Sequence, residues 1–182
     1  MKELSLNILD VAKNSTVAGA TLVEISLVTD EKGILTLTIR DDGCGMDEET
    51  LQNVSDPFYT TRKTRKVGLG LPLLRLAAES TGGTLSITST KDPVRHGTTV
   101  TATFDTAHID FTPIGDVASS IVILIGGDPQ CDFLFTDKTP EREILLDTRE
   151  LRAVLGGVSL AEFEVLEWIR AYLLQQYDNE KT

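Results

Sequence analysis

The amino-acid sequence predicts a two-layer α/β sandwich, with helices on one face of a mixed sheet, followed by a small α+β module. Amphipathic helices and alternating strands follow one another in the order α-β-β-α-α-β-β over the first hundred residues. This segregation is typical of helices packed on one face of a sheet. Apolar residues make up 41% of the chain and charged residues 25%, which is enough apolar material for a core. The pattern changes after Asp105, so we expect one domain over 1–106 and an extension over 107–182.

Each element of the first domain has a local signal in the sequence. Apolar residues recur at helical spacing from residue 4, and β-rich segments alternate between apolar and polar residues. Gly82-Gly83 stands where a helix is expected to end. Between the elements lie a glycine-rich loop over 41–47 and a basic segment over 56–67, which we interpret as a mobile loop. The predicted elements are helices over 4–17, 48–54 and 68–80, and strands over 22–28, 34–39, 84–90 and 98–105.

The extension begins with a linker over 108–115 that contains Pro113. Asp147 or Thr148 is expected to cap one of its helices, and Ser159 with Glu162 has the spacing of a capping box for the last helix. This segment is expected either to form a surface for a protein partner or a homodimer, or to pack as a lobe on the first domain. Its predicted elements are helices over 116–125, 148–155 and 159–177, and strands over 133–137 and 143–147.

The charge balance excludes some classes of partner. The net charge is −11, and from Thr106 onward fourteen Asp and Glu oppose six Lys and Arg, a net of −8. An acidic surface repels nucleic acid and anionic membranes, so we expect neither as a partner. No apolar run approaches the roughly 20 residues of a membrane helix, and the first ten residues lack a signal-peptide pattern. We therefore expect a cytoplasmic protein with two free, reduced cysteines.

The first candidate motif lies on the first predicted helix. Asp10 and Asn14 are four residues apart, so both side chains project from one face. An amide oxygen is a hard neutral ligand that suits Mg²⁺, and a carboxylate one turn earlier can orient or deprotonate a water or hydroxyl near a phosphate. The same spacing also occurs on helices that are simply solvated.

The second motif, from Asp41 to Met46, follows a predicted strand and includes Gly43 and Gly45. A carboxylate at a strand end can accept a hydrogen bond from an exocyclic amine such as that of adenine. Gly43 would let the backbone approach a flat base, and Gly45 would allow unusual dihedral angles. An ordinary Asp-Gly turn is the alternative interpretation.

The third motif is Gly68-Leu69-Gly70-Leu71 at the start of a predicted helix. Backbone N–H groups at a helix start bind phosphate, and glycine permits close approach. The preceding basic segment would suit a lid over a triphosphate, although it could equally be a solvated loop. Its candidate binding residues are Phe58, Thr60, Thr61, Arg62 and Lys66.

The fourth motif, Gly97-Thr98-Thr99-Val100, enters the last strand of the first domain. A threonine hydroxyl there can reach a water shared by Asp41 and a bound base, and we assign this role to Thr99. An ordinary strand threonine is the alternative.

Together the motifs resemble those of the GHKL superfamily of gyrase-type, Hsp90-type, histidine-kinase and mismatch-repair ATPases. Asn14-Ser15 followed by Ala18-Gly19-Ala20 resembles the N box of mismatch-repair ATPases, and the segments from Asp56 and from Gly68 resemble the F and G2 boxes of histidine kinases. The resemblance covers residues 2–105 and implies the Bergerat fold, with ATP and Mg²⁺ as ligands. It implies that Asn14 binds the metal, that Asp41 binds adenine, and that the glycines shape the pocket.

The resemblance also assigns a catalytic position to Asp10, where the ATPases carry a glutamate one methylene longer. Asp42 replaces the usual Asn after the adenine-binding aspartate, and Val67 stands where kinases often have Thr or Gly. Neither His96 nor His108 lies in a phospho-acceptor motif, so we do not expect a complete histidine kinase.

Three functions therefore remain open at the level of sequence. The first is an ATP-dependent regulatory switch or slow ATPase. The second is a protein kinase, either a serine/threonine kinase of the anti-sigma-factor type or the catalytic half of a split histidine kinase. The third is a protein that binds nucleotide without turnover.

Overall fold

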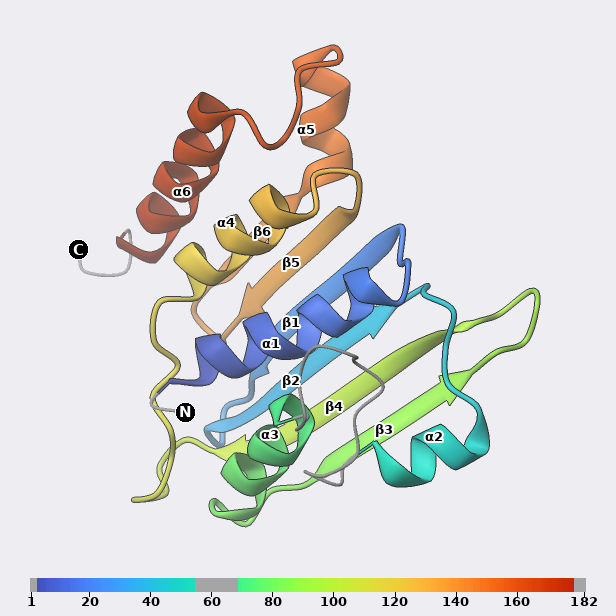
Figure 1. Cartoon of the computed structure of the whole chain (residues 1–182). Coiled ribbons are helices and arrows are strands. Elements are labelled where there is room, and N and C mark those ends of the chain that lie inside the picture. The colour runs from blue at the N-terminus through green and yellow to red at the C-terminus, as the bar shows by residue number, and fades with distance from the viewer. Residues whose placement is uncertain (1–2, 55–68, 179–182) are drawn as a thin grey trace.

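The computed structural model describes residues 3–54 and 69–178 (Figure 1). Over these residues the helices are α1 Leu4–Val17, α2 Glu48–Asn53, α3 Gly70–Glu79, α4 Val117–Gly127, α5 Thr148–Leu155 and α6 Phe163–Asp178. The strands are β1 Leu22–Thr29, β2 Ile34–Asp41, β3 Leu85–Thr90, β4 Gly97–Asp105, β5 Asp132–Lys138 and β6 Glu143–Asp147. None of these helices is both long and apolar enough to cross a bilayer.

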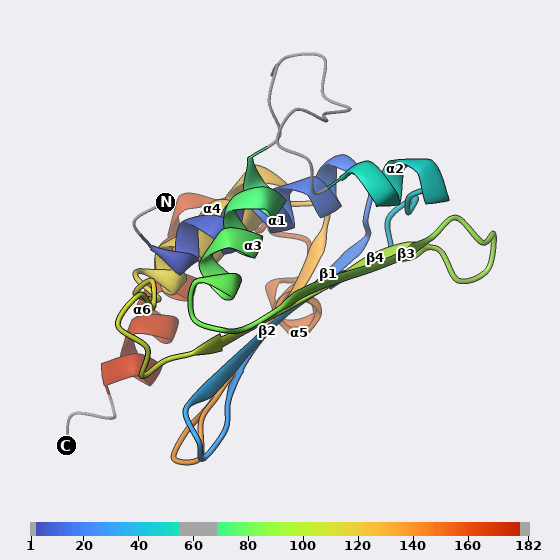
Figure 2. The ribbon, with the colours of Figure 1, turned by 90° about the horizontal axis from the view of Figure 1, so that it is seen from below.

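The six strands form a single mixed sheet in the order β3-β4-β2-β1-β5-β6. Strand β1 pairs with β5 in parallel, and every other neighbouring pair is antiparallel. Seen along the sheet, α1, α3 and α4 lie together on one side of it (Figure 2). The predicted α/β sandwich with helices on one face is therefore confirmed.

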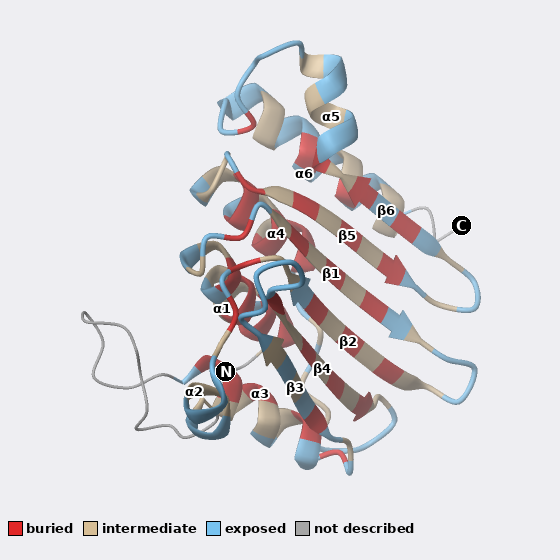
Figure 3. Cartoon of the chain, turned by 90° about the vertical axis from the view of Figure 1, so that its right-hand side faces the viewer, coloured by how far each residue is buried: buried red, intermediate tan, exposed pale blue. Residues whose placement is uncertain are grey.

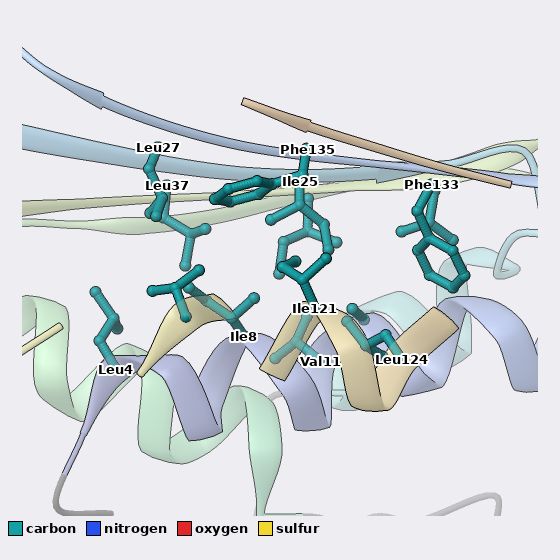
Figure 4. Packing of buried hydrophobic residues seen from close by; sticks show 14 of the residues in the cluster. Leu4, Ile8, Val11, Ile25, Leu27, Leu37, Ile121, Leu124, Phe133 and Phe135 are labelled. Atoms are coloured by element: carbon teal, nitrogen blue, oxygen red, sulfur yellow. The ribbon is translucent and has the colours of Figure 1, made fainter. Parts of the chain in front are cut away.

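Alternation along the strands produces the two faces of the sheet. In β1, Val23, Ile25 and Leu27 are buried against the helices, whereas the residues between them are less buried and lie on the opposite, outer face (Figure 3). The helical layer meets this apolar face with residues such as Leu4 and Ile8 of α1 (Figure 4).

Residues 107–178 pack as a lobe on the first part of the chain. Their strands extend the same sheet, because β5 pairs with β1, and the two helices α1 and α4 lie side by side (Figure 1). Ile121 and Phe133 belong to the same buried cluster as Ile8 (Figure 4). The linker joins the two parts further, since the N–H of Leu4 donates to the Pro113 carbonyl at 2.8 Å. The division at residue 106 stays a prediction.

Polar contacts attach the last helix to the sheet. The buried Asp137 at the end of β5 accepts hydrogen bonds from Tyr177 Oη of α6 at 2.7 Å and from Arg142 Nη2 at 3.2 Å. The Arg142 guanidinium also lies 4.8 Å from the centre of the Tyr177 ring, a cation–π distance. One buried carboxylate thereby connects α6, β5 and the β5–β6 turn.

The cap of the last helix differs from the prediction. The helix begins at Phe163, not at Ser159. Ser159 Oγ accepts a hydrogen bond from the Ala161 N–H at 3.1 Å, and the Glu162 N–H donates to the backbone carbonyl of Ser159 at 3.2 Å. The serine side chain thus satisfies a nearer donor within a turn, so the predicted capping box does not form.

The cap of α5 follows one of the two predicted alternatives. Asp147 Oδ1 accepts from the Arg149 N–H at 2.9 Å. Thr148 is instead buried, and its hydroxyl lies 2.9 Å from Asp132 Oδ1, to which it donates. Asp147 is therefore the capping residue.

Candidate functional site

Asp41, the last residue of β2, is held on the helical face of the sheet by three donors. Its Oδ2 accepts from the Ser15 hydroxyl of α1 at 2.6 Å. Its Oδ1 accepts from the Gly43 N–H at 2.9 Å and from the Thr98 N–H of β4 at 3.2 Å. The carboxylate is thereby fixed in orientation between the first helix and two strands.

The loop after Asp41 is closely packed at its two glycines, most tightly at Gly45. A Cβ on Gly43 would lie 3.0 Å from Ala18 Cβ and 3.0 Å from Asp41 Oδ1. Gly45 has φ +68°, and a Cβ there would lie 1.9 Å from the Thr90 carbonyl oxygen. The N–H of Met46 donates to Ser89 Oγ at 2.8 Å. The loop therefore lies against both α1 and β3.

Asp42 has a different role from its neighbour. Its Oδ1 accepts from the backbone N–H groups of Thr21 at 2.8 Å and of Leu22 at 2.9 Å, and its Oδ2 accepts from the Thr21 hydroxyl. Partial burial acts to raise the pKa of Asp42, but these hydrogen bonds outweigh it and lower the pKa below its usual value. This carboxylate holds the start of β1, which gives a structural reason for Asp at this position.

Asp10 and Asn14 lie one turn apart on α1, where α1 packs against α3. Asp10 is half-buried, whereas Asn14 is exposed. A Cβ on Gly70, the first residue of α3, would lie 2.5 Å from Asp10 Oδ2. In the same segment Leu71 is buried and Leu69 is largely exposed. The carboxylate of Asp10 thus lies directly against the N-terminal turn of α3.

The structure corrects the choice of threonine in the fourth motif. Thr98 pairs with Asp41 across β4 and β2, and its hydroxyl lies 2.8 Å from Ser89 Oγ on the helical face. Thr99 pairs with Arg40 and lies on the outer face, because successive side chains in a strand alternate. The hydroxyl on the face of Asp41 is therefore that of Thr98, and the assignment of Thr99 to a shared water is wrong.

The turn before β4 packs against the loop that follows Asp41. His96 Nδ1 donates to the Gly43 carbonyl oxygen at 2.7 Å. Gly97 has φ +135°, and a Cβ there would lie 2.1 Å from the Asp41 carbonyl oxygen. These contacts hold the β3–β4 turn against the loop that follows β2.

Ser15, Ser89 and His96 are contacts of the site that the motifs did not assign. Ser15 lies on the apolar face of its helix, together with Ile8 and Val11, so its burial was a signal available from the sequence. Ser89 and His96 had no such signal, because their contacts depend on strand pairing and on the turn.

Apart from Thr99, the structure places the described candidates in two groups. Asp41, Gly43, Gly45 and Met46 surround the end of β2, and the remaining group is Asp10, Asn14, Leu69, Gly70 and Leu71 where α1 meets α3. Ser15 follows Asn14 directly, so α1 connects the two groups. The other candidates, Phe58, Thr60, Thr61, Arg62, Lys66 and Gly68, lie outside the described residues.

The described residues form an α/β sandwich with an oriented carboxylate at the end of β2, and comparison with known proteins identifies the family. Residues 1–108 match the sequence model described as "Histidine kinase-, DNA gyrase B-, and HSP90-like ATPase". Because the match covers more than half of the chain, the protein belongs to this family.

The chain is also similar to individual known proteins, in part of their length or in fold. A segment of 59 residues is 41% identical to the C4-dicarboxylate transport sensor protein DctB of Pseudomonas aeruginosa, and it covers 32% of this chain but only 10% of the sensor protein. The fold is similar to the N-terminal domain of a DNA repair protein, with a TM-score of 0.57 and 18% identity over 81% of this chain and 53% of that one. It is also similar to the ADP-complexed MutL ATPase domain of Aquifex aeolicus, with a TM-score of 0.55 and 15% identity over 86% and 70% of the two chains.

Proposed function

We propose that this chain binds ATP with Mg²⁺ along α1 and acts as a nucleotide-dependent regulatory switch or slow ATPase. The observation that carries the proposal is the oriented carboxylate of Asp41, held by Ser15, Gly43 and Thr98 on the helical face of the sheet. Membership of an ATPase family supports the choice of nucleotide. A related fold has been solved with ADP bound, which agrees with it.

Asp41 is suited to bind the base. An ionised carboxylate has about four acceptor positions, and three donors occupy part of this capacity. One further donor, the exocyclic amine of adenine, can therefore be accepted. Gly43 has no side chain, so the base can approach the backbone there. The hydroxyl of Thr98 is available on the same face for a bridging water.

The other group of residues is suited to the phosphates and the metal. Asn14 lies one residue before Ser15, and its amide oxygen is the ligand proposed for Mg²⁺. The N-terminal turn of α3 would face the phosphates, as helix N-termini do in many anion sites. Among the described residues, no group of three or more His, Cys, Asp or Glu could hold a metal by itself. This donor set fits a Mg²⁺ ion that takes its remaining ligands from phosphate and water, and the ion would neutralise phosphate charge.

Asp10 is the proposed catalytic residue. The rise of an α-helix places it about 7.5 Å from Ser15 along the axis of α1, so the base and the phosphates of one nucleotide can lie along the same helix. Its contact with the start of α3 would bring the carboxylate close to a terminal phosphate bound there. From this position it can orient a water molecule and accept its proton.

Calorimetric titration with ATP and Mg²⁺ tests the nucleotide site. Asp41→Asn should weaken ATP binding about a hundredfold, because it removes a charged acceptor from the base. Asp30→Asn is the matched control, because it makes the same change in the turn at the opposite end of the β1–β2 hairpin, where Asp30 accepts from Lys32 and Ile34 N–H groups. Equal affinity of the two variants, both folded, would remove Asp41 from the site.

The partial identity to a sensor protein favours a second candidate, the catalytic half of a split histidine kinase. A serine/threonine kinase of the anti-sigma-factor type is the related alternative, in which Asp10 would accept the proton of a substrate hydroxyl. ATP labelled at the γ-phosphate separates these functions. Label on an added or co-purified protein supports a kinase, and an acid-stable or acid-labile product distinguishes hydroxyl from histidine. Free phosphate without labelled protein supports the switch.

A partner is part of this proposal. We propose that the acidic lobe over 107–178 binds a protein partner in the cytoplasm, with a homodimer as the alternative. The net charge of −8 after Thr106 supports a partner with a basic surface.

A further inference from the structure

We propose that His96 is a positioning residue for the nucleotide base: it holds the backbone of Gly43 in the conformation that meets the base. His96 Nδ1 lies 2.7 Å from the Gly43 carbonyl oxygen, although 53 positions separate the two residues in the sequence. A carbonyl oxygen can only accept a hydrogen bond, so the ring nitrogen carries the hydrogen and donates it. The inference rests on the proposed function, because it assigns a role in the same site to a residue that acts through Gly43.

Hydrogen bonds to three elements hold the peptide groups on either side of Gly43. The Gly43 N–H donates to Asp41 Oδ1, at the end of β2, at 2.9 Å. The next N–H, that of Cys44, donates at 3.0 Å to the carbonyl oxygen of Ala18, which follows α1. His96 adds the third bond from the β3–β4 turn. The peptide group between Gly43 and Cys44 is therefore held at both ends, its N–H by one element and its carbonyl by another.

The composition of this loop makes the restraint important. Gly43 and Gly45 lie on either side of Cys44, and glycine loses more backbone freedom on ordering than any other residue. If the backbone became ordered only when a ligand arrived, this loss of entropy would oppose binding. Contacts that hold Gly43 in advance avoid that cost, so they raise the affinity of the site for the base.

The β3–β4 turn is itself fixed against the loop, so the donor has a defined position. A Cβ on Gly97 would lie 2.1 Å from the Asp41 carbonyl oxygen, so the turn lies directly against the end of β2. Ser89 Oγ accepts from the Met46 N–H at 2.8 Å and donates to the Gly97 carbonyl oxygen at 3.0 Å. The turn cannot move away from Gly43 without breaking these contacts.

The covalent structure of histidine provides a matched pair of variants. The donor Nδ1 of histidine is bonded to Cγ, and the donor Nδ2 of asparagine is bonded to the same carbon. Asparagine at position 96 can therefore donate from nearly the same place. Phenylalanine keeps an aromatic ring but has no donor. His96→Phe thus removes the hydrogen bond to Gly43, and His96→Asn restores it.

Calorimetric titration with ATP and Mg²⁺ measures the effect on the site. We expect His96→Phe to weaken ATP binding about fivefold, and His96→Asn to bind within about twofold of the unmodified chain. His108→Phe is the matched control, because it makes the same change beyond the opposite end of β4, where His108 Nδ1 accepts from the Asp110 N–H at 3.1 Å. Urea unfolding establishes that each variant is fully folded under the conditions of the titration.

Amide hydrogen exchange of the full chain without nucleotide tests the restraint directly. Loss of one of the two bonds to the Gly43–Cys44 peptide group should speed exchange of the Cys44 amide about threefold in His96→Phe. His96→Asn and His108→Phe should leave the exchange rate unchanged. The Thr21 amide, which donates to Asp42 Oδ1 at 2.8 Å, is the internal reference and should exchange equally in all variants.

Weaker ATP binding and faster Cys44 exchange in His96→Phe, both restored in His96→Asn, support the inference. Equal ATP affinity in His96→Phe and in the unmodified chain overturns it and leaves the proposed function standing. Unchanged exchange at Cys44, or a loss of affinity that His96→Asn does not restore, overturns it as well. If the unmodified chain does not bind ATP, the proposed function fails and the role of His96 toward the base fails with it.

Discussion

The carboxylate of Asp10 lies against the backbone of Gly70: a Cβ on that glycine would come within 2.5 Å of Asp10 Oδ2. The two residues are sixty positions apart in the sequence, and they are in contact because α1 packs on α3. This contact brings the proposed catalytic side chain to the helix N-terminus proposed to bind phosphate. Four predictions follow from this and the other contacts of the site.

Asp10→Asn should retain ATP binding and lose turnover. The amide keeps the shape of the side chain but cannot accept a proton from water, so phosphate release should fall about a hundredfold or more. Calorimetry gives the affinity and a phosphate-release assay gives the rate. Glu79→Gln at the far end of α3 is the control for a lost carboxylate, and it should leave both quantities unchanged. Normal turnover in Asp10→Asn would show that another group acts as the base.

Thr98→Val should weaken ATP binding about tenfold, because it removes the hydroxyl on the face of Asp41. Thr101→Val makes the same change on the outer face of the same strand, where Thr101 pairs with Thr38. Its ATP affinity should equal that of the unmodified chain. Calorimetry on both variants checks the assignment, and equal affinities would indicate that the Thr98 hydroxyl takes no part.

Gly45→Ala should destabilise the fold by about 3 kcal/mol, since it combines a positive φ with a clash against the Thr90 carbonyl. Gly19→Ala separates these two effects. Gly19 has φ +75°, but a Cβ there would meet nothing within 4 Å, so the cost should be only about 1 kcal/mol. Urea unfolding of the two variants measures both values. Equal destabilisation would mean that the loop moves away from β3 without cost.

The stability of the fold should fall at acid pH partly through Asp42. Hydrogen bonds from Thr21 and Leu22 outweigh burial and lower the pKa of Asp42 from 3.8. A carboxyl group whose pKa is lowered by folding stabilises the folded state at pH values above the pKa that it has in the unfolded chain. This contribution is lost as the pH falls below about 3.8, towards the pKa of the folded state.

Asp42→Asn keeps an acceptor oxygen but cannot titrate. Urea unfolding at neutral pH and near pH 3 should therefore show a smaller loss of stability on acidification for Asp42→Asn than for the unmodified chain. Asp30→Asn is the control for removal of an exposed carboxylate. An identical acid loss in the unmodified chain and in Asp42→Asn would contradict this role.

Helices and strands whose signals lie within one short segment of the sequence were predictable from it. The first helix has the predicted bounds, Leu4–Val17, because helical periodicity and the small residues after it are local features. The strands were found for the same reason, since alternation of apolar and polar residues is visible within each segment. The last helix was extended too far at its start, because a serine can bond a nearer N–H within a turn as readily as it caps a helix.

Alternation along β4 separates Thr98 from Thr99 within the sequence itself. Val100, Ala102 and Phe104 are the apolar residues of that strand, so alternation puts Thr98 on their face and Thr99 on the other. The position of the hydroxyl relative to Asp41 depends in addition on the pairing of β4 with β2.

By itself, the sequence determined the class of fold, the family and the aspartate at the end of β2, because these depend on periodicity, motif and local turn chemistry. Tertiary structure decided that β5 pairs in parallel with β1, that Ser15 orients Asp41, and that His96 donates to the Gly43 carbonyl oxygen. Such contacts join residues far apart in the chain, and no local pattern encodes them. They are selected by which apolar faces can be buried together once the helices and strands have formed.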